Sequence, residues 1–199
     1  AFPDRFFDVA IAEGHAVAMA AGLAKQGMIP VFAVYASFLQ RGYDQLIHDV
    51  SLLNLHVVLG VDRAGLVGAD GETHHGSFDA LFLSEIPGFT VLCPASFAEL
   101  RRMLRRALFE IPGPVAVRYP RGGEGDYRAD QSEGAATELR PGGDVTILSY
   151  GVMVNQALAA AELLEQRGVC ARVVKLNQIA PLDFDLLAPW LAGTGTLLV

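Results

Sequence analysis

The 199-residue sequence has little cysteine, little positive charge and no long hydrophobic run, and each shortage argues against a class of protein. Its two cysteines, Cys93 and Cys170, lie in separate apolar stretches and form no disulfide or metal-ligand spacing, so we expect buried free thiols in a reducing cytoplasm. A net charge of −7 argues against nucleic acid as the main partner. No apolar run reaches the roughly 18 residues of a membrane span, and the opening AFPDRFF lacks a signal-peptide pattern.

Apolar residues are abundant instead. They make up 52% of the sequence, charged residues make up 19%, and the mean hydropathy is +0.34. Such a composition favours a large core or large buried interfaces, and the length allows one large domain or one domain with part of another. The basic cluster RRMLRR at 101–106 has helical spacing and is interpreted as a solvated helix face.

Helix-like and strand-like segments alternate through the first 119 residues. Ser96, with Glu99 three residues later, has the spacing of a capping box at the start of one helix. Strands that alternate with helices predict an α/β fold with a parallel sheet. The expected helices are 13–25, 38–53 and 96–109, and the expected strands are 30–36, 56–62, 89–94 and 115–119.

A Gly-rich, charged stretch without periodicity then separates two units. We expect a first domain at 1–120, a linker at 121–143 and a second α/β domain at 144–199. The first residue is not Met and the last expected strand has no covering layer, so we expect the second domain to be incomplete. In this domain, strands are expected at 144–150, 170–176 and 196–199, and helices at 153–167 and 181–191.

The loop DRAGLVGADGETHHGSFD, residues 62–79, is the strongest candidate for chemistry. It follows a predicted strand, and ligands of open α/β sheets bind beyond the carboxyl ends of strands. Arg63 suits a phosphate or carboxylate, and His74 and His75 can transfer protons near neutral pH. One alternative is a Gly-rich surface loop with incidental polar residues. Another, less favoured, is a zinc site of the two histidines with Asp70 and Glu72, because neither HxH nor HExxH spacing is present. The sequence has neither a GxSxG nucleophile elbow nor a GxxxxGK[ST] phosphate loop.

A single carboxylate, Glu13, interrupts the apolar run between Asp8 and Asp44. An acid in the first turn of a helix is favoured by the helix dipole, which is a structural explanation. A carboxyl group in an apolar setting also has a strengthened hydrogen bond and an accessible protonated form, which is a catalytic one. The residues alone leave both explanations open.

Four segments, in this order, resemble the C-terminal half of the 1-deoxy-D-xylulose-5-phosphate synthases, thiamine diphosphate enzymes of the transketolase superfamily. They are FFDVAIAEGHAVAMAAGLA, YASFLQRGYDQLIHDV, DRAGLVGADGETHHGSFD and VRYPRG. The resemblance covers essentially the whole chain. It implies a pyrimidine-binding domain followed by the start of the transketolase C-terminal domain.

The resemblance also implies an activity and partners. The family condenses pyruvate with glyceraldehyde 3-phosphate, releasing carbon dioxide, for isoprenoid and thiamine synthesis. It uses thiamine diphosphate and Mg²⁺, and the GDG motif of the diphosphate site does not occur here. We therefore expect an N-terminal diphosphate-binding domain as partner, and a homodimer. The alternatives are a subunit of a split transketolase-like enzyme and a non-catalytic pyrimidine-domain homologue.

Site residues follow from the resemblance, position by position. Glu13 matches the glutamate that hydrogen-bonds N1′ of the cofactor's aminopyrimidine and favours the tautomer that deprotonates the thiazolium carbon. Phe38 matches an aromatic residue stacked on that ring, and Arg41 an arginine beside it. His74 matches a substrate-contacting histidine, with Asp70 nearby to orient it or to contact substrate. The residues expected to hold the substrate phosphate are Tyr35, Arg63 and Arg118, with Arg121 as the alternative to Arg118.

Four further positions are less directly assigned. His15 and His48 are expected to be buried helix histidines with structural hydrogen bonds, and His75 has no assigned role. Gly14 stands where the family often has Gln; the exchange weakens a helical turn by ~1 kcal/mol without moving the carboxyl group of Glu13.

Overall fold

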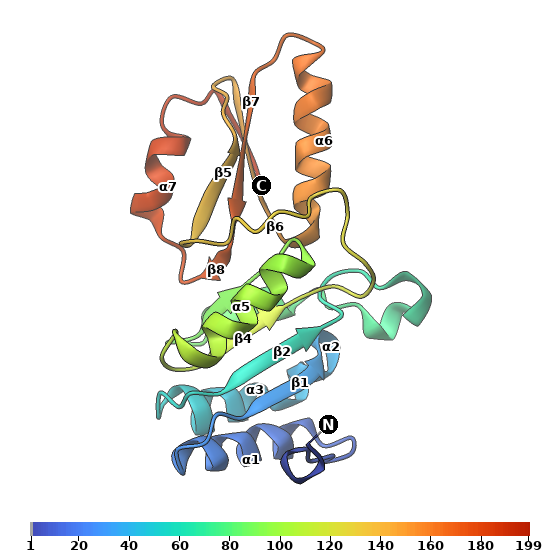
Figure 1. The fold of residues 1–199 in the computed structure, drawn as a ribbon, viewed down its shortest axis with the longest axis vertical. Helices are drawn as coiled ribbons and strands as arrows, with labels where there is room; N and C mark the ends of the chain where they lie inside the picture. The colour runs from blue at the N-terminus through green and yellow to red at the C-terminus, as the bar shows by residue number, and fades with distance from the viewer. Residues whose placement is uncertain (1) are drawn as a thin grey trace.

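The computed structural model describes residues 2–199 and contains two β-sheets, each with helices on both faces (Figure 1). The two α/β units are stacked along the long axis of the molecule, and the chain begins in the first and ends in the second. The predicted α/β class is confirmed. Within the described residues, no helix is both long and apolar enough to cross a membrane.

The first sheet has the strand order β1-β2-β4-β3-β8. Its first four strands run parallel, and β8 pairs antiparallel with β3. The carboxyl ends of the strands are in register, because Tyr35 pairs with Asp62 and Val61 pairs with Arg118. The strands are β1 (Val31–Tyr35), β2 (Val58–Asp62), β3 (Thr90–Leu92), β4 (Val115–Arg118) and β8 (Gln178–Ala180).

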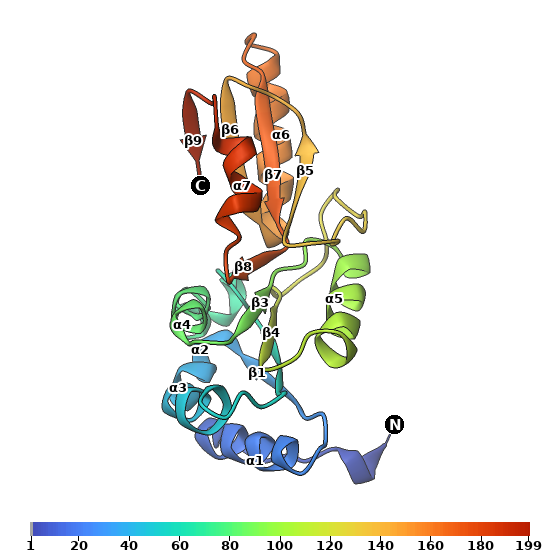
Figure 2. The ribbon, with the colours of Figure 1, turned by 90° about the vertical axis from the view of Figure 1, so that its left-hand side faces the viewer.

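Helices cover both faces of this sheet, which explains its unbroken apolar strands (Figure 2). Leu59 packs into the core beneath α1 to α4, whereas the adjacent Val58 packs toward α5, because successive strand residues face opposite sides. The helices are α1 (Glu13–Lys25), α2 (Ala36–Leu39), α3 (Tyr43–Gln45), α4 (Asp79–Glu85) and α5 (Phe97–Phe109).

The second sheet has the order β5-β7-β6-β9, with β5 antiparallel to β7 and the other pairs parallel. Separate cores lie under α6 and α7, on opposite faces of the sheet (Figure 2). Its elements are β5 (Ala136–Arg140), β6 (Val145–Tyr150), α6 (Val154–Glu165), β7 (Ala171–Leu176), α7 (Phe184–Leu191) and β9 (Thr196–Leu198).

The structure differs from the sequence prediction in the short elements. The single helix expected at 38–53 is divided into α2, a 3₁₀ turn, α3 and the π-helix Leu46–Ser51. The stretch 121–143, expected to lack regular structure, ends in β5, and both β8 and α4 were not predicted. Each of these elements is too short for hydrophobic periodicity to identify it.

Three expectations about individual side chains were wrong. His15 and His48 are exposed rather than buried, because both lie on outward faces of their helices, and Cys170 is exposed just before β7, whereas Cys93 is buried. The cap of α5 forms as expected, with Ser96 Oγ accepting from the Glu99 backbone N–H at 3.2 Å. The Glu99 carboxylate, however, accepts from the N–H of Ala95 and not from that of Ser96.

Candidate active site

Glu13 is the first residue of α1 and pairs with Arg41. Its Oε1 lies 3.2 Å from Arg41 Nη1, and its side chain is 11% exposed while that of Arg41 is 58% exposed. Close packing holds the two segments together, since a Cβ atom on Gly42 would lie 2.9 Å from Val17 Cγ2. Within residues 2–199, Oε2 of Glu13 accepts no hydrogen bond. The carboxylate is therefore mostly buried, anchored on one oxygen and free to accept on the other.

Aromatic rings connect this carboxylate to the 62–79 loop. Phe38 stacks on Tyr35 with ring centroids 5.5 Å apart, and the ring of His74 meets Phe38 edge-on at 5.2 Å. The Arg41 guanidinium carbon lies 5.1 Å from the centre of the Phe38 ring. The Arg63 guanidinium carbon lies 3.7 Å from the centre of the Tyr35 ring. Two arginines, two aromatic rings and a histidine thus form one continuous group.

Arg63 begins the loop in a left-handed backbone conformation, with φ at 60°. Such a conformation is uncommon for a non-glycine residue and occurs mainly where the surroundings enforce it. Its guanidinium hydrogen-bonds Asp62 and also Asp70, the latter at 2.9 Å between Nε and Oδ2. Burial lowers the pKa of Arg63, but the hydrogen bond to Asp70 and the charge of Asp62 more than offset it, so this pKa is raised.

Glycines close the loop on itself. Gly65 and Gly76 exchange backbone hydrogen bonds of 2.9 and 2.8 Å, so the two ends of the loop lie together. A Cβ atom on Gly76 would lie 2.4 Å from the carbonyl oxygen of Arg63 and 2.6 Å from Ala36 Cβ, so only glycine fits. The loop projects from the side of the first domain (Figure 1).

The two adjacent histidines have different surroundings. His75 Nδ1 accepts from the Val67 backbone N–H at 3.1 Å, so this side chain holds the loop in shape. His74 Nδ1 lies 2.9 Å from Thr73 Oγ1, and the ring points toward the aromatic pair. Within residues 2–199, no three His, Cys, Asp or Glu side chains are placed to hold a metal ion.

Asp70 joins two arginines. Its Oδ2 accepts from Arg63 and its Oδ1 lies 3.0 Å from Arg121 Nη1. The carboxylate thus orients the arginines, while the hydrogen-bond partner of His74 is Thr73. Arg121 is 45% exposed, which leaves most of its donors available to a ligand.

Arg118 lies apart from this group, in a buried ion pair. Its Nε and Nη2 donate to both oxygens of Asp79 at 2.8 and 3.2 Å, and the side chains are 10% and 0% exposed. Burial lowers the pKa of Arg118, and its contacts with Asp79 and Cys93 raise it more, so the net shift is upward. The same burial raises the pKa of the Cys93 thiol to about 12.

The structure therefore brings together eight of the nine sequence-assigned site residues. These are Glu13, Tyr35, Phe38, Arg41, Arg63, Asp70, His74 and Arg121. Sequence reasoning assigned no role to Asp62, which is the last residue of β2 and holds Arg63, although an acid at the carboxyl end of a predicted strand is a signal. Gln45 was also not assigned; its Oε1 is buried beside Gly14 without a partner in the described residues.

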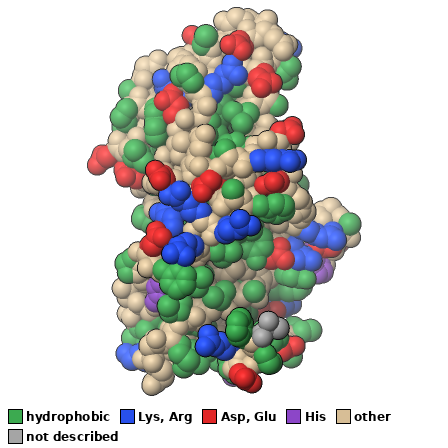
Figure 3. Space-filling model, in the orientation of Figure 1, with side chains coloured by type: hydrophobic (Ala, Val, Ile, Leu, Met, Phe, Trp, Pro, Cys, Tyr) green, Lys and Arg blue, Asp and Glu red, His purple; other side chains and the backbone are tan. Residues whose placement is uncertain are grey.

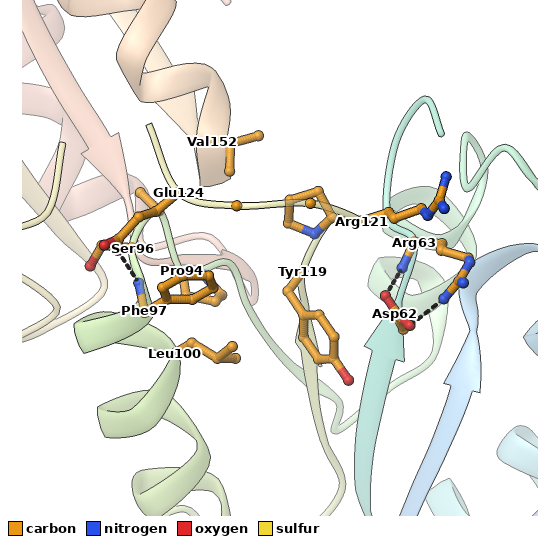
Figure 4. Close-up of a pocket in the computed structure, with 14 residues that line it drawn as sticks. Asp62, Arg63, Pro94, Ser96, Phe97, Leu100, Tyr119, Arg121, Glu124 and Val152 are labelled. Atoms are coloured by element: carbon orange, nitrogen blue, oxygen red, sulfur yellow. Dashed lines mark hydrogen bonds and ion pairs between the residues drawn. The ribbon is translucent and has the colours of Figure 1, made fainter. Parts of the chain in front are cut away.

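A cavity of about 330 Å³ adjoins the arginines (Figure 4). Arg63, Arg121 and Tyr119 lie on one side, and the first turn of α5 with Pro94 and Glu124 lies on the other. The cavity is bounded by both domains, since Val152 comes from the second. Basic groups next to an apolar cavity at the carboxyl edge of a parallel sheet can bind a small anionic molecule.

Fold and site together define a two-domain α/β protein of the transketolase type. A model of the transketolase pyrimidine-binding domain matches residues 1–123, and one of the transketolase C-terminal domain matches residues 134–199. The chain belongs to the transketolase family.

Within that family, the chain is similar to 1-deoxy-D-xylulose-5-phosphate synthases. It is 53% identical over 192 residues to the one from Chlorobium luteolum, covering 94% of this chain and 30% of the relative. It is 50% identical over 202 residues to the one from Heliobacterium modesticaldum, covering 99% and 31%. The chain thus spans about a third of the length of these curated relatives.

Solved structures agree with the fold. A split-gene transketolase, described as an inactive beta4 tetramer, superposes with a TM-score of 0.82 at 33% identity, covering 99% of this chain and 65% of that one. A transketolase mutant from Pichia stipitis gives 0.83 at 18% identity, covering 94% and 29%.

Proposed function

We propose that this chain is the pyrimidine-binding and C-terminal part of a 1-deoxy-D-xylulose-5-phosphate synthase. The complete enzyme condenses pyruvate with glyceraldehyde 3-phosphate and releases carbon dioxide. One observation carries the proposal: the 62–79 loop, Tyr35 and Phe38 connect the Glu13 carboxylate with two arginines in a single group. The identity of about 50% to curated synthases over nearly the whole chain supports it.

The residues present fit the aminopyrimidine of thiamine diphosphate. Glu13 offers a mostly buried carboxylate with one unengaged oxygen, which suits a ring N–H. Phe38 offers an aromatic surface, and Arg41 links it to Glu13, since its guanidinium donates to the carboxylate and lies over the Phe38 ring. When bound, thiamine diphosphate supplies the electron sink for decarboxylation of a 2-oxo acid. Glu13 then holds a proton at the pyrimidine nitrogen, and this is its proposed catalytic role.

The loop and the linker supply the substrate side. We assign the phosphate of the aldehyde to Arg63 and Arg121, with Tyr35 beside them, because two guanidiniums on one carboxylate leave donors for a dianion. Arg118 is less suited, since both ends of its fork already bind Asp79. His74 lies against the Tyr35 and Phe38 rings and is assigned to contact the reacting oxygens.

The remaining parts of the proposal concern the metal, the assembly and the domain boundaries. Mg²⁺ and the diphosphate would be held by a diphosphate-binding domain, and the enzyme would be a cytoplasmic homodimer. We also propose the division 1–120, 121–143 and 144–199 as the working domain boundaries. Exposed apolar side chains near Glu13 support a partner at this surface, with Phe7 59% and Ile11 88% exposed.

The test is substrate specificity in the complete enzyme. Carbon dioxide release from pyruvate should depend on glyceraldehyde 3-phosphate and fall sharply with unphosphorylated glyceraldehyde. Ketol transfer from a sugar phosphate, without pyruvate, would instead identify a transketolase and overturn the proposal.

A second candidate is a subunit of a split enzyme. It is favoured by the split-gene transketolase that matches 99% of this chain at 33% identity. Co-purification of a separately encoded diphosphate-binding chain would establish this arrangement, and a single long polypeptide would exclude it. A non-catalytic homologue is disfavoured, because a scaffold has no need of Glu13, Phe38 and His74 in one group.

A further inference from the structure

One buried ion pair joins the two domains. Lys175 of β7 and Glu99 of α5 are both 0% exposed, and Lys175 Nζ lies 2.6 Å from Glu99 Oε1. The two residues are 76 positions apart in the sequence. Neither belongs to the candidate active site, and the site's chemistry makes no use of them.

The linker takes part in the same contacts. Glu99 Oε1 also accepts from the Tyr127 hydroxyl at 2.8 Å and from the Gln131 backbone N–H at 3.2 Å. Lys175 also donates to the Gln131 carbonyl oxygen at 3.2 Å and to Asn177 Oδ1. We call Glu99, Tyr127, Gln131, Lys175 and Asn177 the interdomain cluster.

Burying the charges of this cluster costs free energy of desolvation. We therefore look for its role in fixing the positions of the segments that it joins. A buried ion pair gains little net stability over a well-packed apolar pair, because both charges must leave water. Burial lowers the pKa of Lys175, and the bond to Glu99 offsets only part of that shift. Burial and Glu99 likewise raise the pKa of Tyr127. A cluster whose donors and acceptors are mutually satisfied admits one arrangement of the three segments that meet there.

The linker is tied to α5 and its cap at several points between residues 124 and 132. Glu124 Oε2 accepts from the Phe97 backbone N–H at 2.8 Å, and Arg106 Nη1 donates to the Ser132 carbonyl oxygen at 3.0 Å. Basic and acidic side chains are mixed on the surface where α5 meets the linker (Figure 3). At its other end the linker presents Arg121 to Asp70. The interdomain cluster and Arg121 therefore terminate one restrained segment, which also forms a wall of the cavity in Figure 4.

We propose that the interdomain cluster positions Arg121: it fixes residues 121–131 on the first domain and thereby sets the place of the guanidinium that binds the aldehyde phosphate. The inference rests on the proposed function for the identity of that ligand. Glu99, Tyr127 and Lys175 are positioning residues, since they act through the linker and touch no substrate.

The mildest probe is Tyr127→Phe in the complete enzyme, which removes one hydroxyl and keeps the ion pair. Loss of a hydrogen bond to a charged group is worth roughly 10- to 150-fold in a local opening equilibrium. Amide hydrogen exchange of residues 121–131 should rise accordingly. The KM for glyceraldehyde 3-phosphate should rise about threefold or more, which corresponds to a partial loss of one charged contact. The KM for pyruvate should not change.

The matched control is Tyr43→Phe, which removes a hydroxyl from a ring packed against Phe82 in the core of the first domain. It should leave linker exchange and both KM values unchanged. Lys175→Met removes the ion pair itself and is the more severe change. Under conditions in which circular dichroism shows this variant to be folded, it should also raise linker exchange and the KM for glyceraldehyde 3-phosphate without changing the KM for pyruvate.

The outcomes separate this inference from the proposed function. Unchanged linker exchange in Tyr127→Phe, or an equal rise in both KM values, would overturn the positioning role. A wild-type enzyme that forms no 1-deoxyxylulose 5-phosphate would overturn the function, and linker exchange alone would then decide whether the cluster holds the linker.

Discussion

At the residue scale, Glu13 combines the two explanations that the sequence left open. It lies in the first turn of α1, where the helix dipole favours an acid, and it also has one oxygen free while the other binds Arg41, which lies over the Phe38 ring. We expect Glu13→Gln in the complete enzyme to reduce turnover about 10²- to 10⁴-fold, the usual contribution of a general acid–base group. The fold should survive, because the amide oxygen still accepts from Arg41.

Proton exchange at C2 of the bound thiazolium, followed by NMR, measures this effect before any substrate reacts. Glu85→Gln, at the exposed end of α4, is the control and should exchange at the wild-type rate. Wild-type exchange in Glu13→Gln would contradict the assignment.

Arg118 and Arg121 are three residues apart, but their substitution by alanine should affect different properties, stability for Arg118 and substrate binding for Arg121. Arg121→Ala removes an exposed side chain that we propose donates to the phosphate, so we expect the KM for glyceraldehyde 3-phosphate to rise roughly 10- to 150-fold with unchanged stability. Arg118→Ala leaves Asp79 buried and unpaired, which should reduce the free energy of unfolding by about 3–5 kcal/mol. Steady-state kinetics and urea titration of both variants distinguish the two. A stable Arg118→Ala enzyme with a selective KM defect would reverse the assignment.

The two thiols should also differ. Cys93 is fully buried with its pKa raised to about 12, so it stays a neutral thiol at pH 8, whereas Cys170 is exposed. Iodoacetamide at pH 8 should therefore label one cysteine in the native protein and both in denaturant. Mass spectrometry of the labelled peptides tests this, and native labelling of Cys93 would mean that β3 opens readily.

At the element scale, the sequence predicts the helices and strands that are long and have a periodic apolar pattern. The helix over 13–25 and the capped start of α5 are found as expected, since each has enough residues for an apolar face or a cap to be recognised. The strand β8 was missed because its three residues form a strand only by pairing with β3. A pairing between distant segments leaves no pattern in the local sequence. The division of 38–53 into short helical pieces was missed for a similar reason.

The 62–79 loop depends on glycine at one point, so Gly76→Ala should disrupt it. An added Cβ would overlap the Arg63 backbone, and the backbone of the loop must then move. We expect a lower melting temperature together with a higher KM for glyceraldehyde 3-phosphate, because Arg63 and Asp70 would no longer be aligned. Gly22→Ala is the contrasting control. It has open space and lies inside α1, so it should stabilise the helix by up to ~1 kcal/mol.

At the scale of the whole molecule, the sequence predicted which candidate residues lie together better than it predicted the contacts around them. Motif resemblance assigned Glu13, Phe38 and His74, and the fold brings them together. The same resemblance did not choose between Arg118 and Arg121, because that choice depends on Asp79 and Asp70, which reach the arginines from other segments. The interdomain cluster was beyond prediction, since a buried lysine 76 residues from its carboxylate leaves no sequence signal.

The 199-residue chain on its own should form no 1-deoxyxylulose 5-phosphate and should bind thiamine diphosphate only weakly. The pyrimidine side of the site is present, but Arg41 is 58% exposed and Ile11 is 88% exposed beside Glu13, so water reaches the carboxylate's surroundings. A hydrogen bond in such a setting is weaker than one enclosed by protein. Most of the cofactor's charge is on its diphosphate, for which Mg²⁺ and oxygen ligands from the proposed partner domain would supply much of the affinity. Isothermal titration with thiamine diphosphate and Mg²⁺ measures this, and the comparison is the chain reconstituted with the proposed diphosphate-binding domain. Micromolar binding by the isolated chain would mean that the diphosphate site lies within these residues, and the division of the site between domains would then be wrong.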